Sequence, residues 1–191
     1  MILSFFFVTL ITAAGVALTY LIESDEPMLW RLAAGNVIGC AVYGTLSLGA
    51  ASFFGLTIPI AVVVLLVALC PLALFLKKKT LAHLRLDWQR AKGKLQGANS
   101  RKFAIFGYYV FFFILFWLFF ERAMFVLPDG IYTGGSHNLG DLPFHLGAIF
   151  SFTDGSNFPP QDPSFANTKF SYPFIADLLT ACFIKLGAGV R

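Results

Sequence analysis

Residues 103–126 read FAIFGYYVFFFILFWLFFERAMFV, an aromatic stretch whose first charges are Glu121 and Arg122 near its far end. Crossing the hydrocarbon core of a bilayer takes about 20 apolar residues in a helix. A water-soluble helix of this length needs a polar face, and this stretch offers none. It therefore predicts a transmembrane helix, and the same criterion applies to the chain on either side of it.

Three more apolar segments fill residues 1–76. The first runs through residues 2–22 and the second through about residues 30–54. The third, residues 55–76, contains Pro71, which we expect to kink the helix near its end because proline cannot donate a backbone hydrogen bond. Each segment is long enough to cross a bilayer, so we predict an all-α membrane protein with the architecture of a polytopic helical bundle.

Gly35 and Gly39 form a small-xxx-small pair within the second apolar segment. In membranes such pairs allow two helix backbones to approach closely. The pair therefore predicts a tight helix–helix contact, and the alternative is two glycines without a packing role.

The composition of the whole chain agrees with a membrane environment. Hydrophobic residues make up 58% of the chain and charged residues 13%, and the mean hydropathy is +0.76. Soluble domains carry about 45–50% apolar and about 25% charged residues. The three cysteines lie far apart within apolar segments, so we do not expect a disulfide framework.

The net charge of +4 comes from one cluster of basic residues. Nine of the fourteen Lys and Arg residues fall between Lys77 and Lys102. Such clusters beside apolar spans are typical of cytoplasmic loops, so we interpret residues 77–102 as a basic cytoplasmic loop and not as a nucleic-acid-binding site. The alternative to a solvated loop is an apolar face along the membrane surface, which would consist of Leu81, Leu84, Leu86 and Trp88.

Alternation of the spans sets the side of the membrane on which the other segments lie. It places the N-terminus and residues 127–174 outside the cytoplasm. Residues 175–191 begin a fifth apolar segment that is short for a full crossing, and we expect the chain to be truncated there. The prediction is therefore about five spans and one long extracytoplasmic loop that contains a short juxtamembrane helix.

The loop of residues 127–174 differs sharply in composition from the spans on either side. It holds four acidic residues and one basic residue. Loops longer than about 12–15 residues are usually functional or disordered, and the many aromatic residues of this one argue against disorder. The loop is therefore where we expect the functional residues.

The run Gly140-Asp141-Leu142-Pro143-Phe144-His145 predicts the start of a helix, with Asp141 at the N-cap and Pro143 in the first turn. If the helix continues to about Phe152, Asp141 and His145 lie four residues apart on one face. Such a pair can act as a general base with its proton partner, as two ligands of a divalent cation, or as a cap and a surface histidine. The spacing alone leaves these three readings open.

Other polar residues of this region have weaker signals. Asp129 and Asp154 each precede a glycine and are expected to form turns. Asn157 and Tyr172 begin proline-containing runs that hold the backbone extended and can shape a substrate groove. Asp177 follows about one turn into the fifth apolar segment, where an embedded carboxylate is costly and often functional; the alternative is a hydrated carboxylate at the membrane interface. We therefore predict Asn157, Tyr172 and Asp177 as substrate-binding residues.

The order of these features resembles a known group of enzymes. An aromatic span is followed by Gly-Asp-Leu-Pro-Phe-His, Asn-Phe-Pro-Pro and Phe-Ser-Tyr-Pro-Phe, and then by a second apolar segment. This order is similar to the N-terminal part of bacterial polytopic membrane glycosyltransferases of the C-type fold, related in plan to the mannosyltransferase and aminoarabinose transferase families. The likeness covers mainly residues 117–186. Three spans precede the one that matches the usual first span, which is a departure from the simplest form of the family.

The resemblance implies a location in the bacterial inner membrane and a polyprenyl-phosphate-linked sugar as donor. It makes Asp141 the candidate catalytic base that deprotonates an acceptor hydroxyl, with His145 as its polar partner. A requirement for a divalent metal is left open. Since the helices that would complete a donor site are missing from these 191 residues, we expect activity only from a longer protein.

Two other functions fit the same sequence. In a transporter or flippase, Glu121, Arg122 and Asp177 would be intramembrane charges along a substrate path. In a non-enzymatic membrane scaffold, the loop of residues 127–174 would bind a partner outside the cytoplasm.

Overall fold

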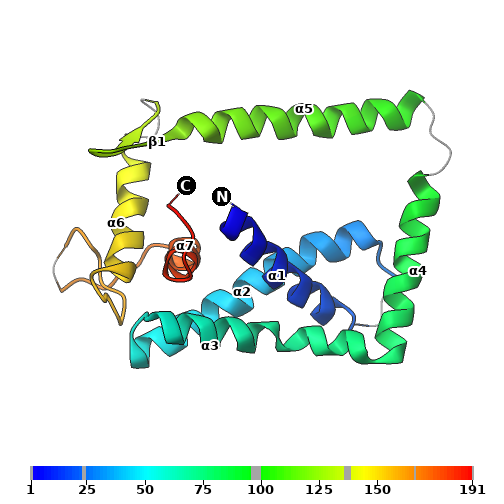
Figure 1. Ribbon diagram of the computed structural model, residues 1–191, viewed down its shortest axis with the longest axis horizontal. Coiled ribbons are helices and arrows are strands. Elements are labelled where there is room, and N and C mark those ends of the chain that lie inside the picture. The colour runs from blue at the N-terminus through cyan, green and yellow to red at the C-terminus, as the bar shows by residue number, and fades with distance from the viewer. Residues whose placement is uncertain (1, 23–24, 96–99, 136–138, 166, 191) are drawn as a thin grey trace. The chain divides into compact units, whose positions relative to one another are not determined.

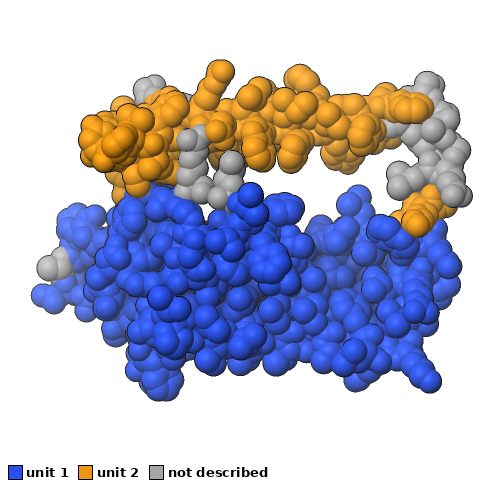
Figure 2. Space-filling model, viewed as in Figure 1, with its two compact units in different colours: residues 1–89, 145–191 blue, residues 90–144 orange. Residues whose placement is uncertain are grey.

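The computed structural model describes residues 2–22, 25–95, 100–135, 139–165 and 167–190 (Figure 1). The chain forms two compact units, Met1–Gln89 with His145–Arg191, and Arg90–Phe144 (Figure 2). In chain order the elements are α1 (Ile2–Thr19), α2 (Met28–Phe54), α3 (Ile58–Leu69), the 3-10 helix η1 (Cys70–Leu76), α4 (Lys78–Leu95), α5 (Ser100–Ala123), β1 (Met124–Leu127), β2 (Gly130–Thr133), α6 (Asp141–Thr153) and α7 (Ile175–Lys185).

Four helices within the described residues are long and apolar enough to cross a membrane. They are α1, α2, the continuous pair α3–η1, and residues Phe103–Ala123 of α5. The protein is thus mostly helical with four candidate membrane-spanning helices, as an all-α membrane protein requires. Helix α7, with 11 residues, is much shorter than the length of about 20 residues that a crossing needs. A fifth span stays a prediction.

The contact between α1 and α2 is made by glycines of both helices. A Cβ atom added at Gly15 would meet the carbonyl oxygen of Gly35, and one added at Gly39 would meet that of Ile11. At Gly35 an added Cβ would lie 2.6 Å from the backbone nitrogen of Val16. The helices therefore touch backbone to backbone, and the close approach predicted from Gly35 and Gly39 is confirmed.

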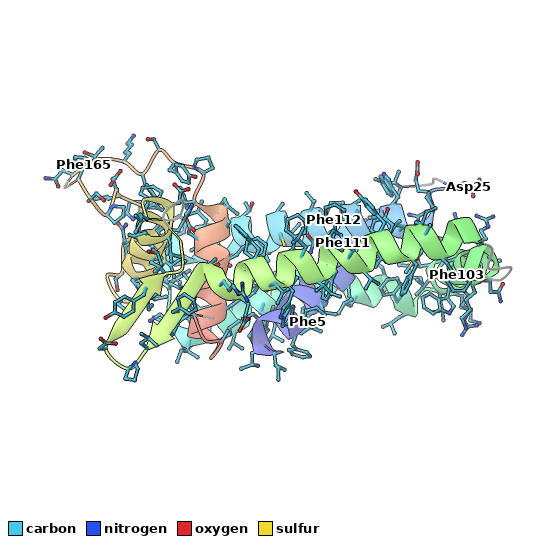
Figure 3. All side chains as sticks on the ribbon, turned by 90° about the horizontal axis from the view of Figure 1, so that it is seen from above. Phe5, Asp25, Phe103, Phe111, Phe112 and Phe165 are labelled. Carbon is cyan, nitrogen blue, oxygen red and sulfur yellow. The ribbon has the colours of Figure 1, made fainter. Side chains whose placement is uncertain are left out.

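Helix α7 packs against α2 and α1 through aromatic rings. The ring of Phe183 stacks on Tyr43 of α2 and on Phe7 of α1, with centroids 6.0 and 5.6 Å apart. Next to Tyr43, a Cβ atom added at Gly44 would lie 2.7 Å from Cγ2 of Ile175. Figures 1 and 3 show that α7 crosses α2 instead of running along it. These contacts, at Ile175 in the first turn and at Phe183 near the end of the helix, hold α7 against α1 and α2.

The α-helical part of the third span ends at Leu69, two residues before Pro71, the residue at which the sequence predicts a kink. The amide of Cys70 donates to the carbonyl of Val67, and the chain continues as the 3-10 helix η1 to Leu76. The basic segment that follows is a helix, α4, over most of its length, where the sequence left open a solvated loop or a segment with an apolar face along the membrane. Helix α4 lies across the end of the α1–α2 pair (Figure 1).

The other unit contains α5 and a β-hairpin. Phe103, Phe111 and Phe112 project from α5 (Figure 3), and the helix ends at Ala123, before the predicted end of the span at residue 126. The reason is the hairpin, because strand β1 pairs antiparallel with β2 from Met124↔Thr133 to Leu127↔Gly130.

Asp129 lies in the tight connection between the two strands. The hydroxyl of Tyr132 donates to its Oδ2 atom at 2.8 Å. This hydrogen bond joins the connection to β2. The predicted turn role of Asp129 is therefore confirmed.

Candidate functional site

The segment between α6 and α7 has an aromatic core of its own. Phe152 of α6 is fully buried, and its ring centroid lies 5.3 Å from that of Phe158 and 5.7 Å from that of Phe174. Phe170 completes the group by stacking on Phe174 at 5.3 Å. We call Phe152, Phe158, Phe170 and Phe174 the aromatic cluster. Phe152 and Phe170 are buried and the other two rings are half-buried, and the packing of these rings gives the loop a defined conformation with little regular secondary structure.

Asn157 uses its side-chain amide to hold this loop together. Its Nδ2 atom donates to the carbonyl of Gln161 at 2.6 Å and to Oγ of Ser151 at 3.1 Å. Its Oδ1 atom accepts the amide hydrogen of Gln161 at 3.0 Å. The structure thus assigns Asn157 a positioning role within the loop, and its contact with a substrate stays a prediction.

Helix α6 begins at Asp141 and carries His145 one turn later. The carbonyl of Gly140 accepts the amide hydrogen of Phe144 at 3.3 Å, so Asp141 is the first helical residue and Gly140 occupies the N-cap position that the sequence assigned to Asp141. The Asp141 side chain is exposed and has no hydrogen bond to another residue of the described chain. A carboxylate at this position stabilises the helix start through the helix dipole. Its catalytic role stays a prediction.

His145 pairs with Asp177, a residue 32 positions later in the sequence. Its Nδ1 atom lies 2.9 Å from Oδ1 and 3.1 Å from Oδ2 of Asp177. The Asp177 side chain is 7% exposed, whereas that of His145 is 37% exposed. A buried carboxylate therefore orients an imidazole that solvent can reach.

Asp177 lies in the first turn of α7, where the helix dipole favours a negative charge. Burial raises the pKa of the Asp177 carboxyl, and the neighbouring His145 partly offsets this effect. When the carboxylate is ionised, it accepts the hydrogen on Nδ1 of His145. This hydrogen bond selects the tautomer in which Nε2 is the basic nitrogen of the ring.

Tyr172 lies against the same histidine. The two rings meet edge to face with centroids 5.7 Å apart, and Tyr172 also stacks on Phe170 of the aromatic cluster at 6.4 Å. The structure thus brings together three of the predicted site residues, His145, Tyr172 and Asp177. Asp141 lies one turn before His145 on α6, and Asn157 holds the following loop.

The chemistry of this site is that of an acid–base pair. Within the described part of the chain, no group of three or more His, Cys, Asp or Glu side chains could hold a metal ion.

The charges of the transporter alternative, Glu121 and Arg122, lie at the C-terminal end of α5.

No family model matches the chain. Comparison with curated proteins and with solved structures also finds no match.

A second polar cluster, which the sequence interpretation missed, joins α4 to α1 and α2. Nε of Arg31 lies 3.0 Å from Oδ2 of Asp87, and its Nη1 atom donates to the carbonyl of Thr19 at 2.8 Å. The hydroxyl of Tyr20 donates to the same Oδ2 at 3.0 Å, and the guanidinium lies 4.2 Å from the centroid of the Tyr20 ring. We call Thr19, Tyr20, Arg31 and Asp87 the Arg31 cluster.

The Arg31 cluster is separate from the His145–Asp177 pair. Gly44, where α7 begins to pack, lies about 20 Å further along α2 than Arg31. Burial and the hydrogen bond to Asp87 raise the pKa of Tyr20 to about 12, so its hydroxyl remains a donor at neutral pH. The sequence contained a signal for this cluster, since Arg31 is the one charge within its span and Asp87 is the one acidic residue of residues 77–102.

Proposed function

We propose that this chain is the N-terminal part of a bacterial inner-membrane glycosyltransferase that moves a sugar from a polyprenyl-phosphate donor to an acceptor at the extracytoplasmic face. The observation that carries the proposal is the hydrogen-bonded pair of His145 and Asp177. A solvent-accessible imidazole held by a buried carboxylate is suited to proton transfer. The order of motifs that resembles C-type glycosyltransferases supplies the reaction class.

In this proposal Asp141 takes the proton from the acceptor hydroxyl. The oxygen then forms a bond to the anomeric carbon, and the bond from this carbon to the lipid phosphate breaks, with its electron pair leaving on the phosphate. The proton then passes to Nε2 of His145, because an imidazole is a stronger base than a carboxylate. Asp177 stabilises the imidazolium that results, as the aspartate of a catalytic triad does.

Tyr172 and Asn157 have supporting roles in the proposal. The Tyr172 side chain is 45% exposed beside His145, so its ring can contact the donor or the acceptor. Asn157 keeps the following loop in the conformation that places Tyr172 there. Asp177 acts through His145.

The test is a transfer assay with the full-length protein in proteoliposomes that contain a polyprenyl-phosphate sugar. We expect Asp141→Asn and His145→Gln to abolish transfer, and Asp177→Asn to reduce it strongly. Asp154→Asn is the matched control, because Asp154 is an exposed turn residue at the end of α6. Undiminished transfer by Asp141→Asn and His145→Gln would refute the proposed mechanism.

The extracytoplasmic location of the loop is tested separately by cysteine labelling. Ser156→Cys, in a background with the three native cysteines replaced by alanine, should react with a membrane-impermeant maleimide added to intact spheroplasts. Labelling only after permeabilisation would place the loop in the cytoplasm.

A further inference from the structure

Asp87 anchors helix α4 to the helices α1 and α2. Asp87 is the only residue of α4 that is both described and buried, with a side chain 8% exposed beside Arg31. Through the Arg31 cluster, this residue fixes α4 across the ends of α1 and α2 (Figure 1). Most of the other described side chains of the helix are exposed.

One face of α4 is an apolar stripe. Leu81, Leu84 and Trp88 follow each other at spacings of three and four residues, so they line one side of the helix. The two leucines are half-buried, and the Trp88 side chain is 54% exposed. An exposed tryptophan in such a stripe is typical of helices that lie in the membrane interface.

The face of α4 turned away from Asp87 is basic. Lys78 and Arg85 lie seven residues apart, which is two helical turns, and both are exposed. Asp87 is the only acidic residue from Lys77 to Leu95, and its charge is balanced by Arg31 inside the bundle. The outer surface of α4 therefore has a net positive charge that no carboxylate of this helix offsets.

We propose that the stripe and the basic face of α4 form a binding surface for anionic phospholipids of the bilayer in which the spans are embedded. Trp88 and the two leucines enter the boundary between headgroups and acyl chains, while Lys78 and Arg85 contact lipid phosphates. Charge complementarity and the apolar stripe together favour a lipid surface, because a soluble acidic partner would use the charges and leave the stripe without a role. This proposal is independent of the glycosyltransferase proposal.

The test uses Trp88 as a fluorescent probe. Replacing Trp30 and Trp117 with phenylalanine leaves Trp88 as the only tryptophan of this chain. The protein is reconstituted into nanodiscs of phosphatidylcholine with a minor fraction of lipid brominated on its acyl chains, either phosphatidylglycerol or phosphatidylcholine. We expect brominated phosphatidylglycerol to quench Trp88 several-fold more strongly than the same fraction of brominated phosphatidylcholine.

Charge variants show whether the basic face causes this preference. In the variant Lys78→Gln/Arg85→Gln, the two brominated lipids should quench Trp88 equally. In the protein without these substitutions, high salt should weaken the preference for brominated phosphatidylglycerol. Lys169→Gln/Lys185→Gln removes the same charge elsewhere and should leave the preference intact. Gel filtration and circular dichroism confirm that each variant is folded.

Three results would overturn the proposal. Absence of quenching by either lipid would show that Trp88 lies outside the bilayer and would favour a soluble partner. Equal quenching by both lipids in the protein that retains Lys78 and Arg85 would show that Trp88 contacts the bilayer but that α4 does not select anionic lipids. Loss of the preference in the control variant would show that overall charge, and not α4, attracts the lipid.

Discussion

Arg31 and Asp87 are 56 residues apart in sequence, yet the Nε atom of Arg31 lies 3.0 Å from Oδ2 of Asp87. Their side chains are only 4% and 8% exposed. Removing one member of such a pair leaves a charge buried without compensation, which costs about 3–5 kcal/mol. Removing both members can be nearly neutral, because the desolvation cost of the two charges disappears with their attraction.

We therefore predict that Asp87→Asn lowers the thermal stability of the purified protein strongly, whereas Arg31→Met/Asp87→Leu recovers most of the loss. Thermal unfolding in detergent, followed by circular dichroism, measures both effects. Asp154→Asn is a control for loss of an exposed carboxylate and should unfold at nearly the parent temperature. If the single and double variants were equally unstable, an uncompensated buried charge could not be the cause of the lost stability.

The glycine contact between α1 and α2 predicts opposite results for two substitutions on one helix. Gly39→Ala places a methyl group against the carbonyl of Ile11, and overpacking of this kind costs about 1–3 kcal/mol. Gly49→Ala is the matched control, because nothing lies within 4 Å of its added Cβ and alanine favours helix by up to about 1 kcal/mol. Unfolding in mixed micelles of increasing SDS fraction measures both. Similar stability of the two variants would argue against the backbone contact.

The aromatic cluster predicts that the loop between α6 and α7 opens when its central ring is removed. Phe152→Ala should destabilise the loop by about 3–5 kcal/mol, because the ring is fully buried. Phe165→Ala in the same loop should have little effect, since Phe165 is 67% exposed. Limited proteolysis of the reconstituted protein should cleave only the first variant rapidly. Equal resistance of both variants would show that the cluster does not hold the loop.

The short contact between His145 and Asp177 predicts the tautomer of the histidine. With the carboxylate as acceptor, the proton of neutral His145 resides on Nδ1. Asp177→Asn can donate as well as accept, so the tautomers should become mixed. ¹⁵N spectra of protein labelled at histidine measure the populations, and the His145→Gln variant assigns the signal among the three histidines. An Nε2-protonated ring in the parent protein would contradict this assignment.

The candidate spans follow from sequence because bilayer thickness sets the length of an apolar helix, and the runs around Pro71 and Phe111 meet that requirement without knowledge of their neighbours. Local signals were equally reliable at Asp129, whose turn depends only on adjacent residues. The hairpin itself was missed because Met124–Leu127 continue the apolar character of α5, and periodicity cannot separate a short strand from the end of a helix.

Which residues pair in the candidate site depends on helix packing and cannot be read from their spacing in the sequence. One-turn spacing favoured Asp141 as the partner of His145, whereas the structure pairs His145 with Asp177 because α7 crosses α2 and is held there by Phe183 and Ile175. The residue types and the region were readable from the chain, since polar side chains in an apolar sequence are conspicuous. Which of them meet depends on how the helices pack in three dimensions, because contacts 32 and 56 residues apart leave no local periodicity in the sequence.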